Sequence, residues 1–248
     1  MSYRDLAEFG LPLIPAEAPN AVLSNQSGKA IVALAFIWQY TMPDGKTRNS
    51  RYSNLGSSMQ LDVLCGRAKV AQDFSSFILP GAKRLITEHG IFGNNLDVLP
   101  PDYKGHLGGG GFAGGGYHKD LNEQIAGIEL TLDIAILEDG LCVGPDESGL
   151  FERISNDLDR QCEAARLILT ALRSDKSDGT IFEILRPLAR RTPPFGANVK
   201  TSSPLLSLFA NMAIDRLVEA DRPELLAWFE PIAESTPSRL HRPSHQTN

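Results

Sequence analysis

The most regular alternation of apolar and polar residues lies between Gly127 and Leu137. The apolar positions in this stretch are spaced by two: Ile128, Leu130, Leu132, Ile134 and Ile136. Residues with this spacing point to the same side of a sheet, so the pattern predicts a strand with one buried face. Asp139-Gly140 follows and predicts a tight turn, because this pair tolerates the positive φ angles of a primed hairpin turn.

Beyond this turn the apolar spacing changes to three and four, which is the period of a helix. One stripe contains Leu150, Ile154, Leu158, Cys162, Ala165, Leu169 and Leu172. We therefore expect a long amphipathic helix over residues 150–172. Further helices are expected over 180–191, 203–220 and 222–234, and Pro187 should kink or shorten the first of these three.

Residues 30–41 predict a second strong strand, because β-branched and aromatic residues dominate there. The stretch is apolar on both faces, which indicates a central position in a sheet. Shorter strands are expected over 20–24, 47–52 and 83–89, whereas 56–77 is compatible with a strand or a short helix. Pro/Gly turns separate these strands without a clear helix between them, so they favour an antiparallel arrangement over a βαβ fold.

The predicted fold class is therefore α+β: an antiparallel β-sandwich of immunoglobulin or fibronectin-III type, followed by a helical C-terminal region. Residues 1–19 contain three prolines and are expected to form an extended arm. The sandwich is assigned to 20–145 and the helical region to 146–234. The polar, proline-containing residues 235–248 are expected to be a disordered tail.

Composition narrows the function classes. With 30 acidic and 24 basic residues the formal net charge is -6, so the overall field repels nucleic acid and anionic membranes. The longest apolar run, residues 30–38, is too short to cross a bilayer. The start lacks a basic region followed by an apolar core, so we expect a cytoplasmic protein by default. The cell envelope is the alternative if the N-terminus is incomplete.

Residues 105–117 are mostly glycine and predict a mobile surface loop. Gly109, Gly111 and Gly114 match the spacing of a dinucleotide-binding fingerprint. No strand precedes them, however, and too little chain follows for a crossover helix, so we expect no nucleotide and no other cofactor. Phe112 and Tyr117 in this loop are the expected contact residues for a partner, together with any exposed apolar face of the last two helices.

His106 and His118 flank the glycine-rich loop, and Asp120 follows closely. Two imidazoles and a carboxylate could hold a metal ion if the loop closed. A glycine-rich loop preorganises ligands poorly, so a solvated loop is the preferred interpretation and these three residues are the metal candidates. No catalytic motif is present, and we assign no catalytic residues.

The three cysteines, Cys65, Cys142 and Cys162, are widely separated. They show neither a Cys-x-x-Cys pair nor a Cys/His metal-binding spacing. We therefore expect them to be buried as small apolar residues rather than to react or to bind metal.

Acidic residues crowd the turns before the long helix. Asp139, Asp146 and Glu147 could bind calcium there. The sequence does not fit an EF-hand, and Asp146 or Ser148 as the N-cap of the helix accounts for the same residues. Helix capping is therefore the preferred interpretation.

Asp133 lies inside the alternating strand. It shares a predicted face with Glu129 and Thr131, so we expect it on the solvent side of the sheet rather than in a catalytic site. A raised pKa within a cleft would argue otherwise.

A longer pattern carries a resemblance. Residues 132–146 read LDIAILEDGLCVGPD and residues 149–154 read GLFERI; upstream lie Asn-x-Ser-x-Lys-x-Ile at 25–31 and Leu-Pro-Gly at 79–81. Over about residues 20–172 this pattern resembles an uncharacterised bacterial protein family of acidobacterial type. The resemblance implies no activity, cofactor or site residue, because none is assigned to that family.

The leading functional prediction is a non-enzymatic binding or protein-interaction module. Sandwiches of the predicted type expose edge strands and end loops to partners, so a protein partner or a small ligand is expected. The alternative is a hydrolase or metal-dependent enzyme with a site between sandwich and helices, near the glycine-rich loop.

Overall fold

The computed structural model describes residues 20–55, 57–72, 74, 76–87, 90–92, 125–174, 176–189, 204–235 and 239–243. The chain divides into two compact units. The sheet unit lies within Met1–Asn54, Val70–Ser148 and Arg242–Asn248, and the helical unit within Leu55–Lys69 and Gly149–His241. The predicted arm over 1–19 lies outside the described residues.

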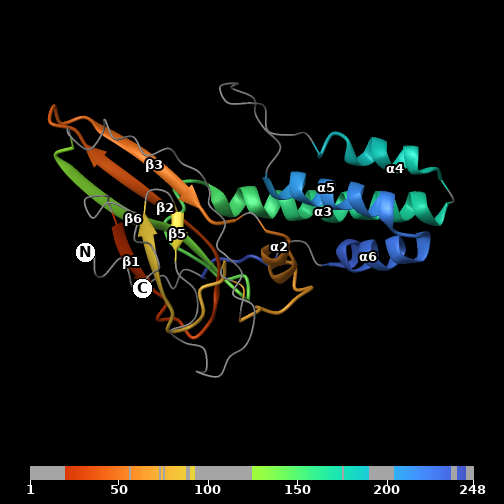
Figure 1. Cartoon of the computed structure of the whole chain (residues 1–248), viewed down its shortest axis with the longest axis horizontal. Helices are drawn as coiled ribbons and strands as arrows, with labels where there is room; N and C mark the ends of the chain where they lie inside the picture. The colour runs from red at the N-terminus through yellow and green to blue at the C-terminus, as the bar shows by residue number, and fades with distance from the viewer. Residues whose placement is uncertain are drawn as a thin grey trace. The chain divides into compact units, whose positions relative to one another are not determined.

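Two antiparallel sheets form the sheet unit (Figure 1). Their strands are β1 (Asn20–Ser24), β2 (Ile31–Thr41), β3 (Thr47–Ser53), β4 (Lys83–Thr87), β5 (Gly90–Phe92), β6 (Gly127–Leu137) and β7 (Cys142–Val143). The first sheet has the order β1-β4-β5 and the second β3-β2-β6-β7. The predicted strands over 20–24, 30–41, 47–52 and 83–89 are therefore confirmed, with ends that differ by at most two residues.

Side chains from both sheets share one apolar core. On β2, Phe36 stacks on Tyr52 of β3 at 4.9 Å between ring centroids. From the other sheet, Ile86 is buried in the same cluster and Leu23 packs against it. Every residue of β2 from Ile31 to Trp38 is buried, and β2 lies between β3 and β6, so its predicted central position is confirmed.

A β-bulge interrupts β6. Ala35 of β2 pairs with Ile134, and the next residue, Phe36, pairs with Leu132. Asp133 is therefore an extra residue on β6. Because side chains alternate between faces, one extra residue moves all later side chains to the opposite face.

The single buried face predicted for β6 is wrong for this reason. Leu130 packs against the shared core, whereas Ile128 and Leu132 are 46% and 38% exposed. Beyond the bulge, Ala135 and Leu137 enter the shared core, and Ile134 is buried on the other face.

The turn after β6 also differs from the predicted one. Gly140 has a φ of 86° and Asp139 has a negative φ, so Glu138-Asp139-Gly140 is a three-residue loop rather than a primed two-residue turn. Asp139 pairs with Lys29 across this end of the sheet unit.

The helical unit contains five described helices: α2 (Ser58–Leu64), α3 (Leu150–Arg173), α4 (Asp178–Leu185), α5 (Pro204–Glu219) and α6 (Arg222–Glu234). The long helix was predicted within one residue at each end. Helix α4 ends two residues before Pro187, as expected for a proline that shortens a helix. Buried residues of α3, α4, α5 and α6 form one core, with Phe209 and Phe229 in edge-to-face contact.

None of the described helices is both long and apolar enough to span a membrane.

Candidate functional site

The carboxylate of Asp133 is fully buried and binds the backbone that precedes α3. Its Oδ1 accepts a hydrogen bond from the Glu147 N–H at 2.7 Å, and its Oδ2 accepts one from the Ser148 N–H at 3.2 Å. Its main-chain oxygen accepts the Asp146 N–H at 2.9 Å. The expectation that Asp133 faces solvent is therefore wrong: the bulge turns its side chain inward, where it anchors residues 146–148.

The anchored segment fits closely against β6. Gly144 has a φ of 122°, and a Cβ there would overlap the main-chain oxygen of Asp133. Asp146 has a φ of 57°, and its carboxylate is paired with Arg242 at 2.6 Å. The N-cap of α3 is Gly149, which makes no side-chain hydrogen bond, so the predicted capping by Asp146 or Ser148 is wrong. Their backbone N–H groups are satisfied by β6 instead.

Before the bulge, β6 has a free side. Within the described residues β6 pairs with β2 along its length, but with β7 only at Ala135 and Ile136. Residues 127–132 therefore have a strand neighbour on one side only, and we call them the open edge. Four of these six residues are exposed and none is buried, so the segment is accessible to a partner.

The opposite edge of the same sheet differs in character. Strand β3 has the sequence TRNSRYS and carries Arg48 and Arg51; all its residues are exposed except the half-buried Tyr52. Charged, polar edge strands resist pairing with other strands. The open edge of β6 instead alternates Ile128, Leu130 and Leu132 with polar residues, and such an apolar edge favours pairing.

A pocket of about 480 Å³ lies in the helical unit, beside the C-terminal ends of α2 and α6. It is lined by Cys65, Gly66, Arg67, Pro231, Glu234, Ser235 and Arg239. Arg67 binds Asp62 Oδ1 through Nε at 2.9 Å and Nη2 at 2.8 Å. Arg239 lies against Gly66, where a side chain would overlap its guanidinium.

The position of Arg67 and Arg239 in this pocket is explained by the charges around them. Helix C-termini carry partial negative charge, which cations nearby stabilise. Asp62 and Glu234 add carboxylates, so the positive charge is balanced locally. Arg67 Nη1 is buried and has no hydrogen-bond partner among the described residues. The pocket therefore offers donors and acceptors together and favours no single charge of ligand.

The thiol in this pocket is a poor nucleophile. Burial raises the pKa of Cys65 to about 11, although the nearby Arg67 lowers it. Only the thiolate attacks or binds metal, and almost none is present near neutral pH. The sulfur lies 4.0 Å from Gln161 Oε1. Cys142 and Cys162 are buried, as expected for small apolar residues.

We expect alkylation of Cys65 by iodoacetamide to have its pH midpoint near 11, and at pH 8 to be roughly 100-fold slower than for an ordinary thiol. The folded state favours the protonated thiol, so this contribution to stability is present below the ordinary pKa of 9.0 and is lost as the pH rises through about 11. Peptide-resolved mass spectrometry measures the rate, and circular dichroism at each pH establishes that the chain is folded. A midpoint near 9 would contradict the burial of the thiol.

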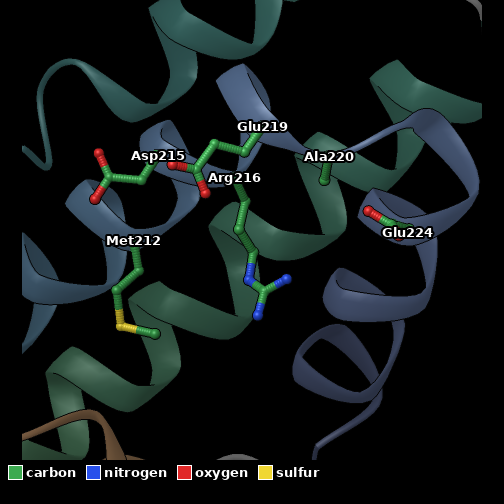
Figure 2. A pocket seen from close by; sticks show the side chains of 6 residues that line it. All are labelled: Met212, Asp215, Arg216, Glu219, Ala220 and Glu224. Carbon is green, nitrogen blue, oxygen red and sulfur yellow. The ribbon is translucent and has the colours of Figure 1, made fainter.

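A second hollow of about 430 Å³ lies on α5 and the start of α6 (Figure 2). Figure 2 shows the Arg216 side chain between Asp215 and Glu219 on one side and Glu224 on the other. The Arg216 guanidinium lies 5.2 Å from the centre of the Trp228 ring, a cation–π contact that already uses its charge. Within the described part of the chain, no group of three or more His, Cys, Asp or Glu could hold a metal ion.

The site residues predicted from sequence lie elsewhere. His106, His118 and Asp120, the metal candidates, are outside the described residues, as are Phe112 and Tyr117 and the glycine fingerprint. On the last two helices the large apolar residues are mostly buried, and Val218 is the prominent exposed exception. The open edge was missed because the sequence does not show the strand order, and only the pairing reveals that β7 reaches no further than Ala135 and Ile136.

Comparison of the chain with protein-family profiles, with curated proteins and with solved structures gives no match. The resemblance to an acidobacterial family therefore stays a prediction. Among the described strand edges, the open edge of β6 combines a missing strand neighbour with two large exposed apolar side chains, Ile128 and Leu132.

Proposed function

We propose that this chain is a non-enzymatic protein-interaction module that adds an extended strand of a partner to the open edge of β6. Strand addition uses the unpaired N–H and C=O groups of an edge strand for affinity and alternate side chains for specificity. The proposal retains the expected immunoglobulin- or fibronectin-III-like sandwich, an architecture that leaves edge strands open to partners.

One observation carries the proposal: residues 127–132 have a strand neighbour on one side only among the described residues, and they expose two large aliphatic side chains, Ile128 and Leu132. An incoming strand would cover both side chains and the backbone between them. Leu132 is 38% exposed, so covering the rest of its side chain contributes about 0.6–1.1 kcal/mol, which corresponds to roughly three- to sevenfold in affinity. The edge also ends at a defined place, because Asp133 and residues 146–148 occupy the next part of β6.

The enzyme alternative lacks a comparable observation. Its candidate ligands His106, His118 and Asp120 lie outside the described residues. In the described pockets, the thiol of Cys65 is held in its protonated form and Arg216 is engaged by Trp228. Neither arrangement supplies an activated nucleophile or a general base.

Selection of displayed peptides tests the proposal. Extended seven-residue peptides are selected on the immobilised full chain, and we expect enrichment of sequences that alternate apolar and polar residues. A synthetic representative should slow hydrogen exchange of the amides at 127–132, and Leu132→Lys should weaken its binding about threefold or more. The matched control is Val22→Lys, because Val22 on β1 is 44% exposed and belongs to the other sheet.

Two results would contradict this function. In the first, no peptide is enriched over the background of the immobilising surface. In the second, the peptides protect β3 rather than β6, or bind the Leu132→Lys and Val22→Lys variants equally well. The variants are first compared by circular dichroism, so that loss of folding is not mistaken for loss of binding.

A further inference from the structure

We infer that the pocket beside the C-terminal ends of α2 and α6 binds a free neutral amino acid, with the ligand carboxylate at Arg239 and Arg67 and the ligand ammonium group at Glu234. The volume of this pocket, about 480 Å³, lies within the usual range of small-molecule sites. All of its lining residues belong to the helical unit. The inference therefore concerns a different ligand from the strand partner of β6 and does not depend on it.

The guanidinium of Arg239 is available to an anion. It lies against Gly66, whose φ of 72° and missing side chain permit this close approach. Within the described residues this guanidinium has no hydrogen bond and no ion pair, and Arg239 is exposed. A guanidinium offers a planar fork of donors that matches the two oxygens of a carboxylate. Arg239 is therefore the primary contact for the ligand carboxylate.

Arg67 adds a second donor to the same pocket. Asp62 Oδ1 accepts hydrogen bonds from its Nε at 2.9 Å and its Nη2 at 2.8 Å, which fixes the guanidinium in place. The remaining nitrogen, Nη1, is buried and has no acceptor among the described residues. A buried donor without an acceptor is rare and unfavourable. Because Arg67 and Arg239 line one pocket, a carboxylate bound at Arg239 can also supply this missing acceptor.

Glu234 brings the opposite charge into the pocket. It is the last residue of α6 and is exposed, and it has no hydrogen bond or ion pair within the part of the chain that the structure describes. The C-terminal end of a helix carries partial negative charge, which favours a cation nearby. A ligand ammonium group beside Glu234 would therefore be stabilised both by the carboxylate and by the end of α6.

The balance of charge in the pocket selects the ligand. Asp62 neutralises Arg67, so the charges of Arg239 and Glu234 remain and sum to zero. Cys65, whose pKa is raised to about 11 by burial, adds no charge near neutral pH. An anion would be attracted by Arg239 but repelled by Glu234, and a cation the reverse. A neutral amino acid carries one carboxylate and one ammonium group and satisfies both residues.

Isothermal titration calorimetry of the full chain tests the site. The probes are the α-amino acids with uncharged side chains, each added in turn. We expect at least one of them to bind. Its N-acetyl derivative lacks the ammonium group and its amide lacks the carboxylate, so each should bind about tenfold or more weakly. Ligand-observed NMR measures the residual binding of these two derivatives.

Variants assign the two charges to their residues. Arg239→Gln should weaken the binding of the amino acid about tenfold or more and leave that of the amide unchanged, because the amide has no carboxylate. Glu234→Gln should likewise weaken the amino acid and leave the N-acetyl derivative unchanged. The matched controls are Arg153→Gln and Glu163→Gln, at exposed positions of α3 that do not line the pocket, and both should bind normally.

The pairing of variants with derivatives separates contact from structure. A purely structural role of Arg239 would weaken the binding of every ligand alike, whereas loss of the amino acid with retention of the amide supports the assigned contact. Three results overturn the inference: no neutral amino acid binds, the derivatives bind as well as their parent, or the control variants weaken binding as much as the pocket variants. Circular dichroism first establishes that each variant is folded.

Discussion

Replacing Gly144 with alanine is expected to destabilise the sheet unit by about 3 kcal/mol or more. The φ of 122° is a backbone conformation that side-chain-bearing residues rarely adopt, at a cost of roughly 1–3 kcal/mol. The new Cβ would also overlap the main-chain oxygen of Asp133 and come within 3.0 Å of Ile134 Cα. Relief of that overlap must move backbone, and overpacking of this kind adds about 1–3 kcal/mol.

Variants at two other glycines separate the cost of the positive φ from the cost of the steric overlap. Gly45 also has a positive φ, of 80°, but nothing lies within 4 Å of its Cβ position, so Gly45→Ala should cost only about 1–2 kcal/mol. Gly28 has open space and no positive φ, and its replacement should be close to neutral. All three lie in the sheet unit.

Urea unfolding followed by tryptophan fluorescence measures these differences. The chain has two tryptophans, the buried Trp38 in the sheet unit and Trp228 in the helical unit, so a Trp228→Phe background reports on the sheet unit alone. A Gly144→Ala variant no less stable than Gly45→Ala would show that the close contact with Asp133 is relieved without cost.

Replacing Asp133 with alanine is expected to cost about 2–5 kcal/mol. The change removes the acceptor for two backbone N–H groups, those of Glu147 and Ser148. A buried donor left without an acceptor costs roughly 1–3 kcal/mol, and the space of a fully buried carboxylate is left unfilled. Residues 146–148 should then detach from β6, so their amides should exchange hydrogen faster.

Two variants serve as controls for Asp133→Ala, one with a similar side chain at the same position and one that removes a nearby carboxylate. Asp133→Asn keeps the shape and one acceptor oxygen and should retain part of the lost stability. Asp139→Ala, in the turn after β6, removes a partly exposed carboxylate paired with Lys29 and should cost about 1 kcal/mol or less. If Asp133→Ala and Asp139→Ala prove equally mild, and exchange at 146–148 is unchanged, the anchoring role is refuted.

Long, regular patterns predicted individual strands and helices correctly. β2 was found because apolar residues cover both of its faces, and α3 because one stripe persists through six turns. For α4 the predicted range ran to residue 191, and the helix ends at Leu185, in line with the expected effect of Pro187. In β2 and α3 many residues follow the same pattern, so a single residue that departs from it does not change the prediction.

Single-residue events were not predicted. The bulge at Asp133 adds one residue to a strand whose alternation continues unbroken in sequence, and only pairing with β2 reveals it. It reverses the expected environment of Asp133 and moves Ile134 and Ile136 to the other face of β6, so the burial along this strand could not be derived from periodicity.

The start of helix α2 does have a signal in the sequence. Ser57 and Gln60 form a capping box, in which the Ser57 side chain accepts the Gln60 N–H and the Gln60 side chain accepts the Ser57 N–H. A Ser-x-x-Gln sequence before an apolar run marks a helix start. This motif favours a helix over a strand at the start of 56–77, where the apolar pattern alone allows both.

The pairing of β2 with β6 has a consequence for synthesis of the chain. All of residues 42–126 must be made between the two strands, and at about 5–20 residues per second this takes on the order of ten seconds. β3 can form a hairpin with β2 early, but the other edge of an almost wholly apolar strand stays unpaired throughout. The emerging chain is therefore most prone to misassembly at β2, where residues 31–38 are all buried once folding is complete.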